Sequence, residues 1–210
     1  MSETLFLPLL TIWSQPGSGS WKESLAVMQR SRIHDWLTAV LPALVWLLFR
    51  YAGNRLSPEA AEILSWGISV AAVFWYCRQR GTSVFCLSFP EFLLWIGVGT
   101  ACGILDRVCF GKPAGPDSSV SGFLLLCILS PAAEEIIYRG FVYERCLRFL
   151  PAAGALVLNS LLFAVAHGTP AGMVAALIAG ILFTLAREKA GTMAAPVILH
   201  IMVNTVVFLL

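Results

Sequence analysis

The chain has 210 residues, of which 58% are hydrophobic and 12% are charged, and its formal net charge is +2. Soluble domains carry about 45–50% apolar and about 25% charged residues, so this composition excludes a soluble domain and indicates a membrane protein. The apolar stretches are continuous, whereas a transmembrane β-barrel needs alternating segments of about 10 residues. The small net charge gives no indication of nucleic-acid binding.

Seven apolar stretches are each close to the roughly 20 residues that a helix needs to cross a bilayer. They cover residues 33–50, 59–77, 90–110, 120–142, 151–167, 171–187 and 192–210. Glycine and proline mark the short connections between them. The predicted fold is therefore all-α, a polytopic transmembrane helical bundle at 33–210 that follows a cytoplasmic or interfacial segment at 1–32. No hydrophilic stretch is long enough for a second domain.

The first apolar run, Leu5–Trp13, is short and has neither a basic segment before it nor a convincing cleavage site after it. We interpret it as interfacial and not as a signal peptide. Apart from Arg139, which lies inside the fourth stretch, nine Lys and Arg residues fall on the side of the N-terminus, against four on the opposite side. Cytoplasmic loops carry the excess of basic residues, which predicts a cytoplasmic N-terminus. The compact chain favours a bacterial plasma membrane.

Two adjacent acids and a base stand in the fourth apolar stretch, at Glu134, Glu135 and Arg139. An ionisable side chain inside a bilayer costs roughly 2.5–3.5 kcal/mol, so these residues need partners and mark a candidate functional site. Glu135 and Arg139 are four residues apart and share a helix face, so they can pair. Glu134 points about 100° away and can act as a base. The alternative is a purely structural ion pair.

Two further polar patterns follow on later spans, Phe163-x-x-x-His167 and His200-x-x-x-Asn204. Either histidine alone is better explained as a core residue with satisfied hydrogen bonds. Together with the acids they indicate a shared site, because His200 and Asn204 also face the same way. The remaining histidine, His34, stands at the mouth of the first span and is interpreted as interfacial.

A hairpin at Pro151 would bring His167 to the acids. Glu135 lies about 15 residues before this turn and His167 about 16 after it. At about 1.5 Å per residue, both lie roughly 23–24 Å from the turn and therefore at the same depth. The last helix brings His200 part of the way to that level, and helix tilt decides whether it reaches Glu134.

Small residues indicate where helices pack closely. Gly172, Ala176 and Gly180 recur every four residues, and Gly99-x-x-x-Gly103 repeats the spacing in the third span. The cysteines form no C-x-x-C pair and are predicted to pack as small apolar side chains. They are Cys77, Cys86, Cys102, Cys109, Cys127 and Cys146.

The three polar motifs, in this order on successive apolar helices, resemble the CPBP family over residues 120–210. That family comprises the type II CAAX prenyl endopeptidases and bacterial relatives that include bacteriocin-processing and immunity proteins. The resemblance implies an intramembrane peptide hydrolase of the glutamic type. It implies that Glu134 is the general base that activates water and that His167 assists it.

The resemblance also implies roles for the other polar residues. His200 and Asn204 would stabilise the oxyanion, and donors preorganised in this way typically contribute about 2.7–4 kcal/mol. Glu135 and Arg139 would support the helix that carries the base and contact the substrate. The implied partners are the lipid bilayer and a membrane-anchored protein or peptide, which is prenylated, lipidated or carries a C-terminal sorting tail.

A zinc site is the alternative, because two acids and two histidines are ordinary zinc ligands. The chain has no H-E-x-x-H pattern, and Asn204 is better suited to donate to an oxyanion than to bind a metal. We therefore expect no metal or other cofactor. A non-enzymatic membrane partner in immunity or sorting is a second alternative. A small transporter is disfavoured, since spans one to three lack distributed polar residues and an internal repeat.

Overall fold

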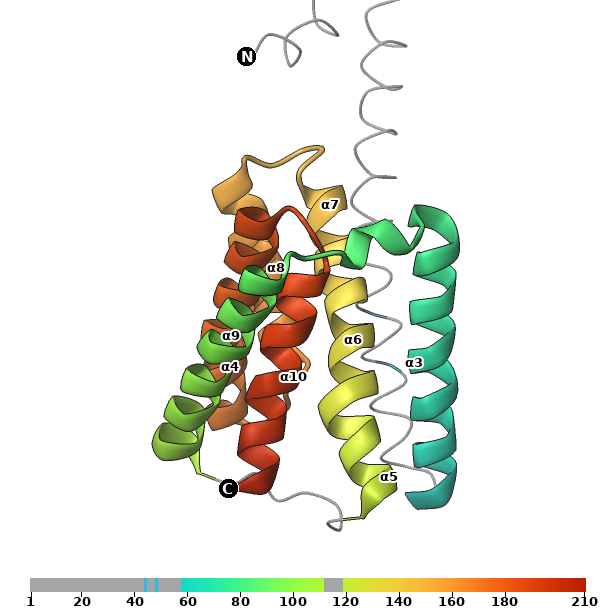
Figure 1. The fold of residues 1–210 in the computed structure, drawn as a ribbon, viewed down its shortest axis with the longest axis vertical. Coiled ribbons are helices and arrows are strands. Elements are labelled where there is room, and N and C mark those ends of the chain that lie inside the picture. The colour runs from blue at the N-terminus through green and yellow to red at the C-terminus, as the bar shows by residue number, and fades with distance from the viewer. Residues whose placement is uncertain (1–43, 45–47, 49–57, 112–118) are drawn as a thin grey trace, which may run out of the picture. The chain divides into compact units, whose positions relative to one another are not determined.

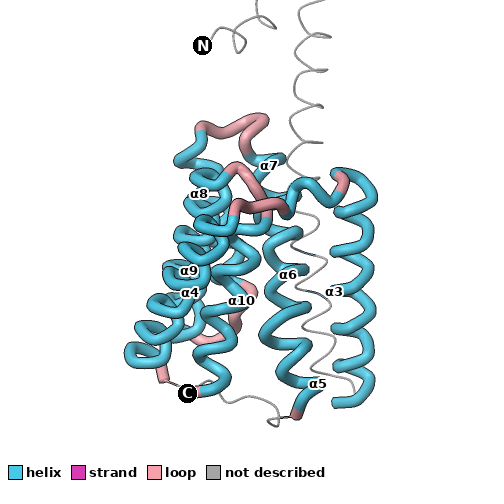
Figure 2. Tube along the Cα trace, in the orientation of Figure 1, coloured by secondary structure: helices cyan, strands magenta, loops and turns pink. Residues whose placement is uncertain are grey.

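The structure is a computed structural model that describes residues 44, 48, 58–111 and 119–210. Figure 2 shows that helices form nearly all of this part of the chain. The elements are α3 (Pro58–Arg80), η2 (Thr82–Phe85), α4 (Phe89–Phe110), α5 (Val120–Phe123), η3 (Leu124–Leu129), α6 (Ser130–Glu135), η4 (Ile136–Val142), α7 (Tyr143–Cys146), α8 (Ala152–Val165), α9 (Pro170–Ala190) and α10 (Ala194–Leu209). The predicted all-α class is confirmed for these residues, and the first predicted span, 33–50, lies almost wholly outside them.

Three helices are long and apolar enough to cross a membrane: α4, the continuous helix Val120–Cys146, and α9. Helices α8 and α10 are apolar but shorter. Helix α3 has 23 residues but is not among the three. The described residues therefore support an integral membrane protein, while the predicted number of seven spans is not confirmed.

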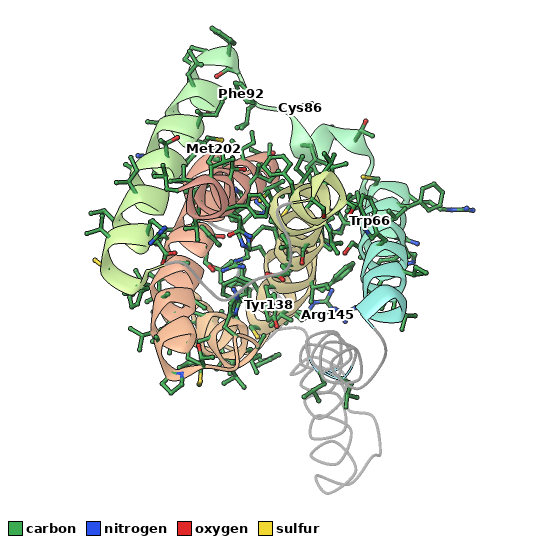
Figure 3. The ribbon with its side chains drawn as sticks, turned by 90° about the horizontal axis from the view of Figure 1, so that it is seen from below. Trp66, Cys86, Phe92, Tyr138, Arg145 and Met202 are labelled. Carbon is green, nitrogen blue, oxygen red and sulfur yellow. The ribbon has the colours of Figure 1, made fainter. Side chains whose placement is uncertain are left out.

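Helix α10 lies between α4 on one side and the Val120–Cys146 helix on the other (Figures 1 and 3). Helix α3 packs on the far side of the Val120–Cys146 helix, and α8 and α9 pack against each other. The Val120–Cys146 helix is thus covered from several directions, which is why most side chains from Pro131 to Tyr143 are buried.

Two stretches of the Val120–Cys146 helix have π-helical geometry, η3 and η4. After η3, the N–H of Ser130 donates to the carbonyl of Leu125, five residues back. After η4, the N–H of Tyr143 likewise donates to the carbonyl of Tyr138. π-Helical turns are rare and often stand at functional sites. The six-residue α6, which carries Glu134 and Glu135, lies between these two stretches.

Local sequence signals set the helix ends. The Glu91 carboxylate accepts hydrogen bonds from the backbone N–H (2.9 Å) and the hydroxyl (2.6 Å) of Ser88, which fixes the start of α4. The hydroxyl of Thr169 accepts from the N–H of Gly172 at 3.1 Å and caps α9. Gly191 ends α9 in the left-handed conformation, with a φ of 66°.

The predicted close approach at Gly99 and Gly103 is confirmed, and the partner is α10. A Cβ atom on Gly99 would lie 2.7 Å from Cβ of Met202 and 2.8 Å from the carbonyl oxygen of Leu199. A Cβ atom on Gly103 would lie 3.0 Å from the carbonyl oxygen of Val203. The two helices therefore run in the same direction with their backbones in contact, which sets the position of α10 and of the polar residues on it.

The predicted small-residue stripe on α9 is confirmed in part. A Cβ atom on Gly180 would lie 3.2 Å from Cα of Ser160, so α9 approaches α8 closely there. Ala176 is buried. The nearest atoms to a Cβ on Gly172 belong to Thr169 and His167 in the preceding turn, so Gly172 shapes the start of α9 and is not a helix contact.

Replacing Gly99 with Ala is expected to lower the free energy of unfolding in detergent by about 1–3 kcal/mol, the usual cost of overpacking. The added methyl group meets backbone atoms of α10, which cannot rotate away. Gly97→Ala is the matched control, because a Cβ there meets nothing within 4 Å. Equal unfolding midpoints for the two variants would contradict the proposed contact.

One end of the bundle carries a cluster of charges. Arg80 at the end of α3 and Arg187 near the end of α9 both pair with Glu144, the second at 3.4 Å. Nearby, the N–H of Met193 donates to the carbonyl of Val84 at 2.8 Å. The ends of α3, α7 and α9 therefore meet at one end, as the predicted sidedness of the basic residues requires.

Candidate active site

The acids of α6 lie in the interior of the helices. Glu134 is 5% exposed, Glu135 and Arg139 are fully buried, and His200 of α10 is 4% exposed. Buried charges are costly unless they are paired and hydrogen-bonded, so the contacts of these side chains determine whether the cluster is plausible.

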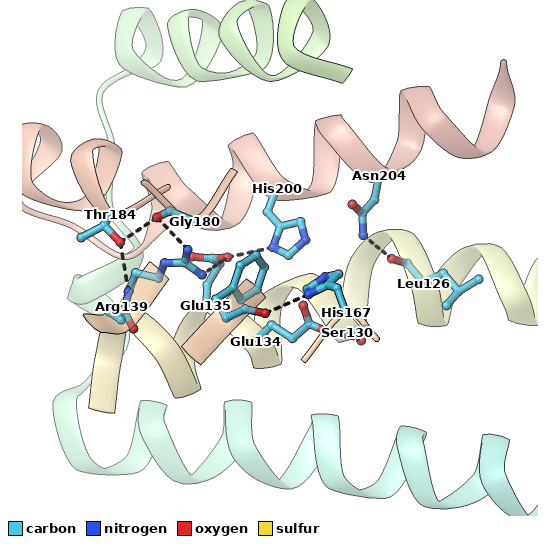
Figure 4. Close-up of polar contacts among 12 residues, drawn as sticks. Leu126, Ser130, Glu134, Glu135, Arg139, His167, Gly180, Thr184, His200 and Asn204 are labelled. Atoms are coloured by element: carbon cyan, nitrogen blue, oxygen red, sulfur yellow. Dashed lines mark hydrogen bonds and ion pairs between the residues drawn. The ribbon is translucent and has the colours of Figure 1, made fainter. Parts of the chain in front are cut away.

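The predicted pair of Glu135 and Arg139 is present. Nη1 of Arg139 donates to Oε1 of Glu135 at 2.9 Å, and Nη2 donates to the carbonyl oxygen of Gly180 at 3.0 Å (Figure 4). Cζ of Arg139 lies 4.5 Å from the ring centroid of Phe163 and 5.2 Å from that of Phe183. A planar cation is thus held by a carboxylate, a carbonyl and two aromatic faces, which fits the preferences of arginine.

His200 contacts Glu135 directly. Its Nδ1 atom lies 2.8 Å from Oε1 of Glu135, the same oxygen that accepts from Arg139. An ionised carboxylate only accepts hydrogen bonds, so Nδ1 is the donor to Glu135. The ring stacks on Phe183 with centroids 4.5 Å apart and meets the edge of Phe163 at 5.9 Å. The orientation of His200 is therefore fixed by one carboxylate and two aromatic rings.

Glu134 points to a different part of the site, as its position next to Glu135 predicts. Its Oε1 atom accepts from the hydroxyl of Ser130 at 3.2 Å. His200 is close enough to interact electrostatically with both Glu134 and His167. The structure thus gathers the predicted base and both histidines around one region, although they come from two helices and a turn.

His167 lies beyond the end of α8, in the turn that leads to α9. The helix ends at Val165, so the predicted span 151–167 ends two residues too late. Nδ1 of His167 lies 2.9 Å from the carbonyl oxygen of Phe163, and because a carbonyl only accepts, Nδ1 donates and Nε2 points elsewhere. The ring centroid lies 4.7 Å from that of Phe163, which places both histidines against one aromatic side chain.

Asn204 stands one turn after His200 on α10 and is partly buried. Its Nδ2 atom donates to the carbonyl oxygen of Leu126 at 2.9 Å. The cluster therefore has a contacting centre, formed by Glu135, Arg139 and His200, while Asn204 is anchored separately to the η3 segment (Figure 4).

Sequence reasoning missed a polar ladder behind the site. Nδ2 of Asn159 donates to Oγ1 of Thr184 at 3.0 Å, and Oγ1 of Thr184 donates to the carbonyl oxygen of Gly180 at 2.9 Å. That carbonyl also accepts from Arg139. The side chains of Asn159 and Thr184 are fully buried in apolar helices. A polar residue within an apolar stretch was the sequence signal that could have identified them. Asp106 of α4 was also missed, and it interacts electrostatically with His167.

The zinc alternative needs three protein ligands that converge on one point. Within residues 58–111 and 119–210, the structure groups no three His, Cys, Asp or Glu side chains in a way that could hold a metal ion. Oε1 of Glu135 is occupied by Arg139 and His200. The arrangement of these residues does not fit a zinc site.

Comparison with known families singles out the same region. Residues 116–206 match a family model described as Type II CAAX prenyl endopeptidase Rce1-like. The match contains all three polar motifs and confirms the family resemblance seen in the sequence. No curated protein and no solved structure matches the chain.

Proposed function

We propose that the chain, which over residues 116–206 matches the Rce1-like type II CAAX prenyl endopeptidase family model, hydrolyses a peptide bond of a membrane-anchored protein or peptide. The observation that carries this proposal is the buried cluster itself. Glu135, Arg139 and His200 are in contact inside an apolar bundle, with Glu134 and His167 within electrostatic range of His200. A purely structural ion pair requires neither histidine.

In the proposed reaction, Glu134 takes a proton from a water molecule, whose oxygen attacks the scissile carbonyl carbon. His167 assists, because its Nδ1–H is held by the Phe163 carbonyl and its Nε2 is left to contact the water or the substrate. When the tetrahedral intermediate collapses, the C–N bond breaks and Glu134 returns the proton to the leaving amine. General acid–base catalysis of this kind contributes about 10²–10⁴-fold.

The oxyanion is stabilised by His200 and Asn204. The Glu135 carboxylate accepts from Nδ1 of His200 and fixes the ring, and in the proposed step the ring donates to the oxyanion from Nε2 in its protonated form. Asn204 donates with the amide N–H that is not used on Leu126. In this scheme Glu135 and Arg139 are positioning residues, since they act through His200.

The orientation in the membrane is part of the proposal. The end of the bundle that carries Arg80 and Arg187 faces the cytoplasm, in line with the excess of basic residues on that side. Reporter fusions at Gly81 and Gly111, on either side of α4, are expected to report the cytoplasm and the opposite side, respectively. Fusions that report one and the same side would contradict this topology.

The test uses the purified chain in liposomes, with peptides that carry a prenylated C-terminal cysteine, an N-terminal lipid or an unmodified C-terminal tail. Mass spectrometry of the products identifies the cleaved bond. We expect cleavage of a membrane-anchored peptide, and no cleavage of the same sequence without its anchor. Activity is expected to survive a strong chelator.

Two outcomes would overturn the proposal. Binding of an anchored peptide without any cleavage, across all three classes, would favour a non-enzymatic partner in immunity or sorting. Activity that disappears with the chelator and returns only with zinc would make the acids and histidines metal ligands.

A further inference from the structure

The backbone of η3 leaves one carbonyl group without its regular partner. The N–H of Ser130 donates to the carbonyl of Leu125, five residues back. The next N–H in this π-helical register would come from residue 131 and would reach the carbonyl of Leu126. Residue 131 is a proline, which has no N–H. Pro131 therefore releases the Leu126 carbonyl from the helix.

The side chain of Asn204 takes the place of the missing N–H. Its Nδ2 atom lies 2.9 Å from the Leu126 carbonyl oxygen, across the contact between α10 and the η3 segment (Figure 4). Backbone carbonyls inside a protein are almost always hydrogen-bonded, because an unpaired one loses the energy of hydration without replacement. The released carbonyl thus provides a fixed acceptor for one Asn side chain, 78 positions away in the chain.

This contact determines how the amide is turned. A carbonyl only accepts, so it selects the NH₂ end of the amide and holds one of its two N–H groups. Because the amide is planar, the direction of the second N–H and of the side-chain oxygen is then fixed as well. Without the acceptor, the amide could rotate or flip.

We propose that Pro131 is a positioning residue for Asn204, which by releasing the Leu126 carbonyl fixes the amide that donates to the oxyanion. The activity part of this inference rests on the proposed function, and the structural part does not. An oxyanion donor is effective because it is already oriented before the reaction starts. An N–H at position 131 would compete for the Leu126 carbonyl, or would let η3 relax to an α-helix in which Ser130 donates to it.

The activity test is a double-mutant cycle of Pro131→Ala and Asn204→Ala. Asn204→Ala is expected to lower kcat by about 10²–10³, the usual loss for one oxyanion donor. Pro131→Ala alone is expected to lower kcat by about 10-fold with little change in KM, because the donor is present but misoriented. In the Asn204→Ala background, Pro131→Ala should have no further effect. An equal effect of Pro131→Ala in both backgrounds, or none in either, would overturn the inference.

Pro90→Ala is the matched control. Pro90 is exposed in the first turn of α4, where an added N–H has no helical acceptor to take, so activity should not change. Ala is also the better helix former, so Pro131→Ala should fold at least as well as the parent. Pro131→Ser adds the same N–H and serves as a second variant if Pro131→Ala does not accumulate.

A spectroscopic readout separates this inference from the proposed function. In ¹⁵N-labelled protein in detergent, the Asn204 side-chain NH₂ resonance is the one that Asn204→Ala removes. In Pro131→Ala it is expected to move upfield in the proton dimension as the hydrogen bond to Leu126 is lost, and Pro90→Ala should leave it in place. An unmoved resonance in Pro131→Ala overturns the inference. A moved resonance in a protein that cleaves no peptide supports the inference and rejects the proposed function.

Discussion

Glu134→Gln is expected to lower kcat by about 10²–10⁴ with little change in KM, because it removes the general base and keeps the shape of the side chain. The Gln side chain can still accept a hydrogen bond from Ser130, as Oε1 of Glu134 does at 3.2 Å. The change adds no volume to a residue that is 5% exposed, so the fold should be preserved. Peptide cleavage by the reconstituted protein gives the rates, and binding of an uncleaved peptide is measured in parallel.

Glu144→Gln is the control for charge removal. Glu144 pairs with Arg80 and Arg187 at one end of the bundle, away from the cluster, so its loss should leave kcat unchanged. If both substitutions reduce cleavage equally, Glu134 acts through the stability of the protein and not as a base. If Glu134→Gln retains full activity, another group must activate the water.

The positions of the helices follow closely from the apolar pattern, while their ends depend on local signals. The fourth stretch was predicted at 120–142 and forms one helix from Val120 to Cys146, because Glu144 pairs with Arg80 and Arg187 at its end instead of stopping it. The fifth ends at Val165, where Gly168 adopts a φ of 70° and Thr169 caps the next helix. No residue pattern in the sequence predicted the π-helical turns on either side of α6.

Whether a contact of the site could be predicted depends on how far apart its two residues are in the sequence. The pair of Glu135 and Arg139 could be predicted, because four residues is one helical turn. The contact between His200 and Glu135 could not, since it joins two helices 65 residues apart and depends on where α10 lies. That position is set by contacts such as the one at Gly99, which the sequence indicated without naming the partner helix. Tertiary packing therefore decides which oxygen His200 meets, whereas His167 meets the carbonyl oxygen of Phe163, only four residues back.

Among the substitutions considered, removal of the positive charge of Arg139 is expected to lower the free energy of unfolding the most. Arg139→Met keeps a long apolar side chain against Phe163 and Phe183 but leaves the Glu135 carboxylate buried without its cation. Breaking a buried ion pair on one side typically costs about 3–5 kcal/mol. We expect a loss of this size in the free energy of unfolding, measured by denaturant titration in detergent, together with loss of cleavage because Glu135 no longer holds His200 in one orientation.

Two further variants separate the charge from the packing. Arg187→Met breaks a pair with Glu144 that is partly exposed and 3.4 Å long, so it should cost at most about 1 kcal/mol. The double variant Arg139→Met with Glu135→Leu removes both charges, and apolar replacements of buried pairs are often neutral, so it should regain most of the lost stability. It should not regain activity, because His200 then lacks the carboxylate that orients it. A double variant as unstable as Arg139→Met alone would mean that Arg139 acts through its bond to Gly180 and its aromatic contacts, and not through its charge on Glu135.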